Sequence, residues 1–137
     1  MLDSIEIIND AKNQTDLEYF GNPLFLEGFE SLVQSINKEA DLNDIGMEAQ
    51  KHRLTGILVN LLRIEEACIQ NPEILNEEIK APVVIVGLPR TGSTMTHRLL
   101  ASDPRHTAML WWEGRYPAML KDELRGNPEE RMKMGKA

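Results

Sequence analysis

The sequence has 137 residues, of which 42% are hydrophobic and 27% are charged, and its formal net charge is −7. This length suffices for one domain or part of one, and the composition is that of a folded globular chain. The acidic balance argues against a dedicated nucleic-acid-binding protein, which needs a basic face to replace the counterions of the phosphates. A nucleotide ligand stays open, because one local cluster of hydrogen-bond donors can bind a phosphate.

A single cysteine, Cys68, excludes an internal disulfide bond. It lies in an apolar helical stretch, where it is expected to be a small buried hydrophobe. Residues 1–6 lack the basic and apolar regions of a signal peptide. The longest apolar run, around Val83–Val86, is far shorter than the roughly 20 residues of a membrane helix. We therefore expect a soluble, cytoplasmic protein without a membrane span.

Residues 1–80 are predicted to form a helical N-terminal region. A short helix is expected within residues 1–20, and a second begins at Asn22-Pro23, a cap followed by a first-turn proline. A third, longer helix runs from Ile45 to Gln70 and stops at Asn71-Pro72. The apolar residues of these helices recur at helical spacing, which favours packing against the following domain over a partner-binding or membrane-surface face.

The pattern changes at Ala81. Residues 82–86, Pro-Val-Val-Ile-Val, form a β-branched run typical of a strand buried on both faces of a parallel sheet. A loop follows at 87–94, then a helix over 95–102, then a short second strand near 107–110. The predicted fold class is α/β: a P-loop-type parallel sheet with flanking helices begins at residues 81–137, incomplete in this chain. Residues 128–137 are predicted to start another helix.

The loop Gly87-Leu88-Pro89-Arg90-Thr91-Gly92-Ser93-Thr94 carries the chemistry. The N–H groups at a helix start are unpaired and carry partial positive charge, so they bind a phosphate. Gly87 and Gly92 allow the backbone to curl around an anion. Ser93 and Thr94 add hydroxyl donors, and Arg90 adds a forked cation. The loop therefore predicts a phosphate-binding site.

The spacing of Gly87 and Gly92 equals that of the Walker A loop, GxxxxGK[ST]. Ser93, however, stands where nucleoside triphosphatases carry the lysine that binds the β and γ phosphates. A phosphate that bears a different transferable group fits this loop better. A P-loop kinase or nucleoside triphosphatase is the second hypothesis. A non-catalytic module that binds phosphate or a partner chain is the third.

Residues 87–94 resemble the 5′-phosphosulfate-binding loop of the sulfotransferase family, in the branch that includes the tyrosylprotein sulfotransferases. The resemblance continues through residues 99–104, Leu-Leu-Ala-Ser-Asp-Pro, and Trp112-Glu113. It is strong over residues 80–117 and weaker before them. Loop, Asp-Pro and Trp-Glu in this order are more specific than the loop alone.

The resemblance implies 3′-phosphoadenosine 5′-phosphosulfate as the co-substrate, with no metal, and a small-molecule, glycan, lipid or peptide acceptor. The residues it places at the donor are Arg90, Thr91, Gly92, Ser93 and Thr94. Arg90 would also act in catalysis, and Glu113 would be the base that takes a proton from an acceptor hydroxyl or amine.

Alternatives remain for several of these roles. Glu113 can instead be a structural carboxylate that bonds the backbone or pairs with Arg115. His97 and His106 are weaker candidates for the base, and Trp111 and Trp112 are expected to be packing residues. The arginine and serine that hold the donor 3′-phosphate in this family have no match here. We therefore expect the N-terminal part of a longer sulfotransferase, inactive alone, with the missing C-terminal part as a partner.

Overall fold

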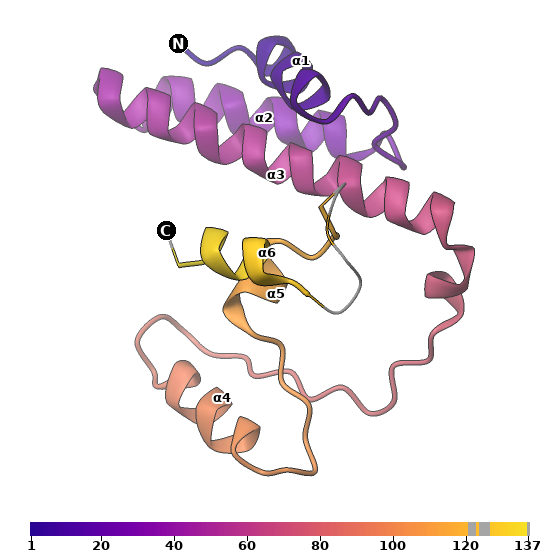
Figure 1. Ribbon diagram of the computed structural model, residues 1–137. Helices are drawn as coiled ribbons and strands as arrows, with labels where there is room; N and C mark the ends of the chain where they lie inside the picture. Colours follow the sequence, from indigo (N-terminus) through magenta and orange to yellow (C-terminus); the bar gives the residue numbers. More distant parts are fainter. Residues whose placement is uncertain (121–122, 124–126, 137) are drawn as a thin grey trace.

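The computed structural model describes residues 1–120, 123 and 127–136. The elements, in chain order, are α1 (Ser4–Thr15), α2 (Phe25–Glu39), α3 (Asp44–Gln70), the 3-10 helix η1 (Pro72–Asn76), α4 (Ser93–Ala101), α5 (Trp111–Arg115) and α6 (Glu129–Met134). In Figure 1, α1, α2 and α3 form one helical unit, and α5 and α6 lie between this unit and α4.

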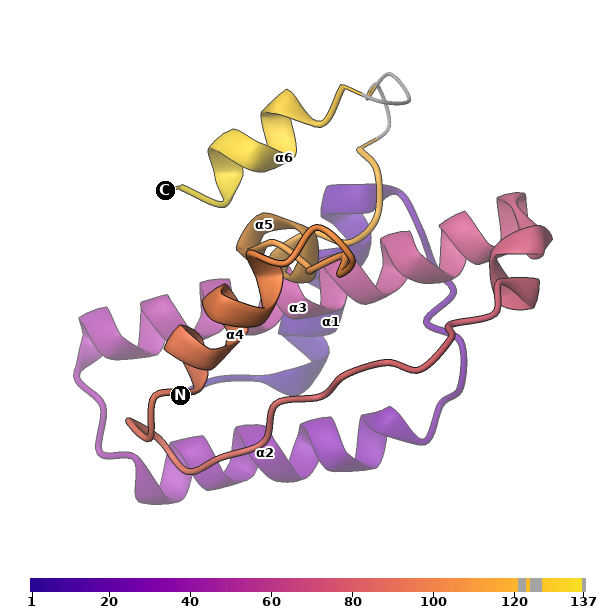
Figure 2. The ribbon, with the colours of Figure 1, turned by 90° about the horizontal axis from the view of Figure 1, so that it is seen from below.

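The three long helices share one apolar core. Figure 2 shows them side by side from a second direction, with α3 as the longest. The core residues come from α1, α2 and α3 and from the chain before α1: Leu2, Ile7, Ala11, Val33, Leu54, Leu58, Val59 and Leu62. Burial of these side chains from separate helices is the main source of stability here, because isolated helices of this length are marginal in water.

Polar side chains fix the ends of the helical unit. The carboxylate of Asp3 accepts hydrogen bonds from the N–H groups of Ile5 and Glu6 and caps α1. The Asn43 side chain caps α3 by accepting from Gly46 N at 2.9 Å. The side chain of Asn37 accepts a hydrogen bond from Leu2 N and donates one to Leu2 O, both at 2.8 Å, so α2 holds the chain segment that precedes α1.

One cation joins α1 to α3. Lys51 Nζ lies 2.8 Å from Glu6 Oε1 and 3.1 Å from Asp10 Oδ2. Hydrogen bonds to these two carboxylates, Glu6 first, raise the pKa of Lys51 above its ordinary value. All three groups are partly exposed, so the contacts fix the register of the helices more than they add stability.

The helix predictions are confirmed with small changes of boundary. The third helix starts at Asp44 and ends at Gln70, and Asn71-Pro72 follows it. α2 starts at Phe25, not at Pro23 as predicted, because Asn22 Oδ1 accepts from Leu24 N at 3.0 Å and forms a turn ahead of the helix. α4 ends at Ala101, with Ser102 as its C-cap residue. The predicted last helix is α6, and Ala137 lies outside the described residues.

The predicted strands are not seen in the described part of the chain. Residues 82–86 run as an extended single segment, with Val83, Val84 and Val86 exposed by 69%, 76% and 88%. Residues 107–110 are likewise not paired as a strand. A strand needs a neighbour to accept and donate its ladder hydrogen bonds, and no described segment supplies one. The parallel sheet of the predicted fold class is thus not seen in the described residues, whereas α1, α2 and α3 lie within residues 1–80, where helices were predicted.

The solvent-accessible surface of the chain is large because the segment from 71 to 107 is open. The chain exposes 11,020 Å², whereas a compact monomer of its mass exposes about 7,300 Å². Residues from 71 to 107 are almost all exposed.

A buried ion pair ties the last helix to the chain before it. The side chains of Arg131 and Glu123 are 11% and 3% exposed and meet at 2.7 Å. Arg131 also donates to the carbonyl of Tyr116 at 2.8 Å and lies 5.1 Å from the centre of the Trp112 ring. Its hydrogen bonds hold the pKa of Glu123 below the ordinary value. α5 and α6 are therefore packed as a pair.

No helix in the described ranges combines the length and the apolar character needed to span a membrane.

The core of the helical unit predicts a contrast between two neighbouring residues of α3. Leu58 is 2% exposed, whereas Ile57 is 45% exposed. Leu58→Ala should lower the free energy of unfolding by about 2–5 kcal/mol, because it removes buried methyl groups and leaves a cavity. Ile57→Ala should cost less than about 1 kcal/mol. Urea unfolding followed by circular dichroism measures both, and equal losses would contradict the packing described.

Candidate functional site

In the loop before α4, the sign of the backbone angle φ alternates from residue to residue. Arg90 has a φ of 64° and Gly92 a φ of 89°, while Thr91 between them lies outside the positive-φ region. Alternating conformations of this kind turn successive N–H groups toward one side and form a concave anion-binding nest. A non-glycine residue at positive φ is uncommon and strained, and such strain concentrates at functional sites.

The Thr91 hydroxyl closes this loop. It donates to the carbonyl of Leu88 at 2.7 Å. A methyl group on Gly87 would lie 2.8 Å from the same hydroxyl oxygen, a distance that Cβ atoms do not adopt. Gly87 thus makes room for the approach of Thr91, and its predicted role in the curl around an anion stays a prediction. Sequence reasoning missed this role of Thr91.

The N–H groups that follow have no protein acceptor. The first backbone hydrogen bond of α4 runs from Thr96 N to Gly92 O at 3.0 Å. Among the described residues, none accepts from the N–H groups of residues 91–95, and the hydroxyls of Ser93 and Thr94 make no hydrogen bond. The structure therefore brings together unpaired donors from Thr91, Gly92, Ser93 and Thr94 at the positive end of a nine-residue helix.

Arg90 adds a cation to this loop. Its side chain is exposed, and it forms no ion pair with any carboxylate in the part of the chain that the structure describes. Its charge is therefore not neutralised by a carboxylate of the described residues. The loop has the donors and the charge that a phosphate or phosphosulfate group needs.

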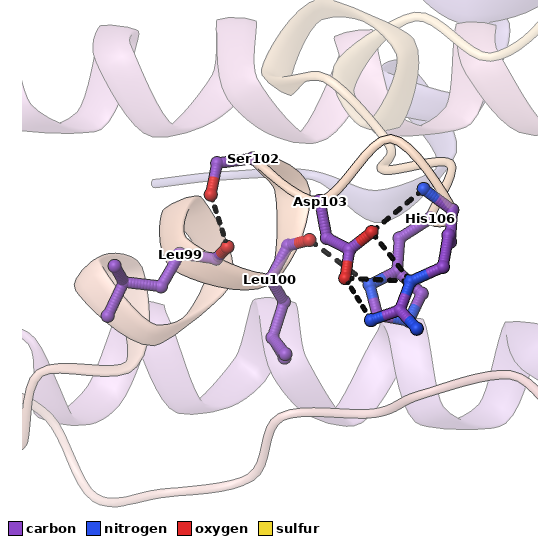
Figure 3. A network of polar contacts seen from close by, with 6 residues as sticks. Leu99, Leu100, Ser102, Asp103 and His106 are labelled. Carbon is purple, nitrogen blue, oxygen red and sulfur yellow. Dashed lines mark hydrogen bonds and ion pairs between the residues drawn. The ribbon is translucent and has the colours of Figure 1, made fainter.

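The end of α4 is fixed by a polar network, which Figure 3 shows. Arg105 donates through Nε and Nη2 to the carboxylate of Asp103, at distances from 2.6 to 3.1 Å. The Ser102 hydroxyl donates to Leu99 O at 2.7 Å, and His106 Nδ1 lies 3.2 Å from Leu100 O. Hydrogen bonds from Arg105 lower the pKa of Asp103 to about 2. These contacts satisfy carbonyls at the helix end and turn the chain toward α5.

A groove of about 770 Å³ lies between α4 and the chain from Ala108 to Arg115. Thr94, in the first turn of α4, is one of its lining residues, so the groove reaches the start of this helix. Trp111 and His97 also line it. Trp111 is 76% exposed and so is not the packing residue that was expected. Trp112 packs as predicted, next to Arg131, with a buried indole N–H that has no described acceptor.

Glu113 lies in the first turn of α5. Its Oε2 accepts a hydrogen bond from Leu110 N at 2.6 Å, so the carboxylate caps the helix. The other oxygen has no hydrogen-bond partner among the described residues, and no ion pair with Arg115 is formed. Glu113 is not in the lining of the groove. Its role as a base stays a prediction, as does that of Arg90 in catalysis.

The two histidines differ in position. His97 lies in the groove, whereas His106 is held against the end of α4. Across the ranges that the structure describes, no three side chains of His, Cys, Asp or Glu gather in a way that could hold a metal ion.

Comparisons with known proteins show what this chain is similar to. Residues 82–136 match the sequence model of the sulfotransferase family. The structure is similar to that of sulfotransferase STF1 from Mycobacterium tuberculosis H37Rv, with a TM-score of 0.83 and 30% identity over 97% of this chain. The chain spans 37% of that protein's length. A search of curated proteins gave no significant match. Residues 82–136 are thus similar to the sulfotransferase family, and the described fold is similar to part of a sulfotransferase.

The Asp103–Arg105 pair predicts a pH effect. Because the pKa of Asp103 in the folded chain, about 2, lies below the ordinary 3.8, its carboxylate stabilises the fold above that ordinary value, and this contribution is lost as the pH falls toward 2. Arg105→Gln should return the Asp103 pKa toward 3.8, measured by carboxyl-carbon NMR titration. Arg53→Gln, on the exposed side of α3, should leave it unchanged. A low pKa that persists in Arg105→Gln would contradict the cause given.

Proposed function

We propose that this chain is part of an enzyme that transfers a sulfonyl group from 3′-phosphoadenosine 5′-phosphosulfate to a hydroxyl or amine of an acceptor. The observation that carries the proposal is the set of unpaired N–H groups at residues 91–95, at the start of α4 and beside an arginine. Ser93 in place of a lysine disfavours nucleoside triphosphate hydrolysis. The match of residues 82–136 to the sulfotransferase family model and the structural similarity to a sulfotransferase support the same reaction type.

The donor supplies the sulfonyl group, and the loop binds its 5′ end. In this proposal the N–H groups from Thr91 to Thr94 and the hydroxyls of Ser93 and Thr94 donate to its oxygens. Arg90 adds positive charge. These groups stabilise the negative charge that develops on the departing phosphate, and they are oriented before the reaction begins. No metal is assigned to this role.

Glu113 is the proposed base. Its Oε2 is fixed by Leu110 N, while its other oxygen is without a described partner and is available to accept a proton from an acceptor hydroxyl or amine. This hydrogen bond orients the carboxylate through one oxygen and leaves the second oxygen without a described partner. Glu113 thereby combines the two roles between which the sequence left a choice.

The wider organisation is proposed on the same basis. Residues 1–80 are a helical region, and residues 81–137 begin the P-loop-type α/β domain. Segment 82–86 pairs as a strand where the remaining part of the sulfotransferase fold lies beside it. The proposed location is the cytoplasm.

Donor binding tests the function directly. Isothermal titration calorimetry should show that the chain binds 3′,5′-adenosine diphosphate in the absence of metal and prefers it to ATP with magnesium. Arg90→Ala should weaken this binding about tenfold or more, since a charge-assisted hydrogen bond contributes about 1.5–3 kcal/mol.

Arg53→Ala is the matched control, because Arg53 is exposed on α3 and remote in sequence from the loop. It should bind like the wild type. A preference for ATP with magnesium would favour a kinase or triphosphatase, and absence of binding in a folded chain would overturn the proposal.

Two substitutions separate the base from the cap at Glu113. Glu113→Gln keeps an oxygen that accepts from Leu110 N but loses the basic carboxylate. In a form of the protein that turns over, it should lower the transfer rate about 100-fold or more while donor binding changes little. Glu113→Ala should lose the cap as well, and with it about 1 kcal/mol of stability. A Glu113→Gln variant with the wild-type rate would remove Glu113 from the mechanism.

A further inference from the structure

The groove between α4 and α5 differs in charge from the chain as a whole. We propose that it binds the acceptor, and that this acceptor is an amphipathic anion, with an apolar body and a carboxylate or similar acidic group. The inference rests on the proposed function, because it assigns the groove to the acceptor of the same transfer reaction. Glu113, the proposed base, is not itself in the lining, but Trp111, Gly114 and Arg115 of the same helix are, so the base lies next to the groove.

Position is the first argument. Thr94 contributes both to the start of α4, where the phosphate donors lie, and to the lining of the groove. A molecule in the groove would therefore adjoin the group held by the loop. Its volume of about 770 Å³ is within the range of small-molecule pockets.

The wall of the groove is mainly apolar. Met109, Leu110 and Trp111 line one side, and they are 68%, 52% and 76% exposed. Ala101 and Ala108 add small apolar surfaces. Large apolar side chains that gather in one exposed hollow mark a surface for an apolar ligand or partner. The body of the ligand is accordingly apolar.

The charged side chains of the groove are all of one sign. Arg98 and Arg115 line it, and no acidic residue does. This holds in a chain whose net charge is −7.

The arginines nearby form two groups. Arg105 and Arg131 are paired with Asp103 and Glu123. Arg98 and Arg115, the two in the groove, make no ion pair within the described ranges. Cationic side chains on an apolar wall, left without protein carboxylates, are complementary to an anionic group of a ligand.

Arg115 is held in place by the rest of the fold. Its carbonyl accepts from Asn60 Nδ2 of α3 at 2.7 Å, and its guanidinium lies 5.7 Å from the centre of the Tyr116 ring. The helical unit thus positions one cation of the groove. Since side-chain entropy lost on binding is smaller for a side chain already held, this favours binding.

Calorimetry on the 137-residue chain tests the proposal with two probes, 4-hexylbenzoate and the uncharged 4-hexylbenzamide. The benzoate should bind at least about fivefold more tightly. Arg98→Gln and Arg115→Gln should each weaken benzoate binding up to about fivefold and leave the benzamide unchanged, because partly exposed ion pairs contribute up to about 1 kcal/mol. Trp111→Ala should weaken both probes, and Arg53→Gln should weaken neither.

The outcomes separate this inference from the proposed function. Equal binding of the two probes, or no effect of Trp111→Ala, would overturn the groove as an anionic acceptor site. So would competition by 3′,5′-adenosine diphosphate together with weaker nucleotide binding in Arg98→Gln and Arg115→Gln, since the groove would then belong to the donor. Nucleotide binding with no benzoate binding rejects the inference alone, whereas benzoate binding without nucleotide binding rejects the proposed function.

Discussion

The hydrogen bond from the Thr91 hydroxyl to the Leu88 carbonyl is the constraint on which the site depends. It closes the loop over four residues and holds Arg90 in a left-handed conformation that few non-glycine residues adopt. Gly87 makes room for the hydroxyl, and Gly92 begins α4 at positive φ. Because the chain enters the helix in this way, the N–H groups at its start stay open to a ligand and are not consumed by a side-chain cap. The anion site is thus a product of loop closure.

Helices and strands were unequally predictable from the sequence, for a physical reason. The bonds of α3 join residues four apart, and its cap, Asn43, lies next to it, so the pattern and the stop signal at Asn71-Pro72 suffice to define it. Residues 82–86 have the composition of a buried strand but depend on a neighbour elsewhere in a chain. Local sequence sets the preference for extended backbone, which the structure retains. The ladder is not local, and in the described chain it is absent.

The same division applies to the site. The order of glycine, arginine, glycine and hydroxyl residues predicts the anion loop, because its donors are neighbours in sequence. The cap formed by Glu113 is also local, and the sequence left it open as an alternative. The groove was not predictable, since it requires α4 to lie against the segment before Arg115. Asn60, which fixes that segment, is 55 residues away and looks like any polar residue of a helix.

The distribution of charge joins loop and groove into one surface. Near α4 and α5, Glu113 caps a helix without a cation partner in the described chain, but Asp103 bonds Arg105 and Glu123 bonds Arg131. The paired arginines largely neutralise the negative charge of Asp103 and Glu123. Near these helices, Arg90 in the loop and Arg98 and Arg115 in the groove have no such partner among the described residues. This acidic chain thus places these three cations in the loop before α4 and in the groove beside it. Local positive charge of this kind attracts anions despite the net charge of −7, and the acidity of the chain disfavours non-specific binding of nucleic acid.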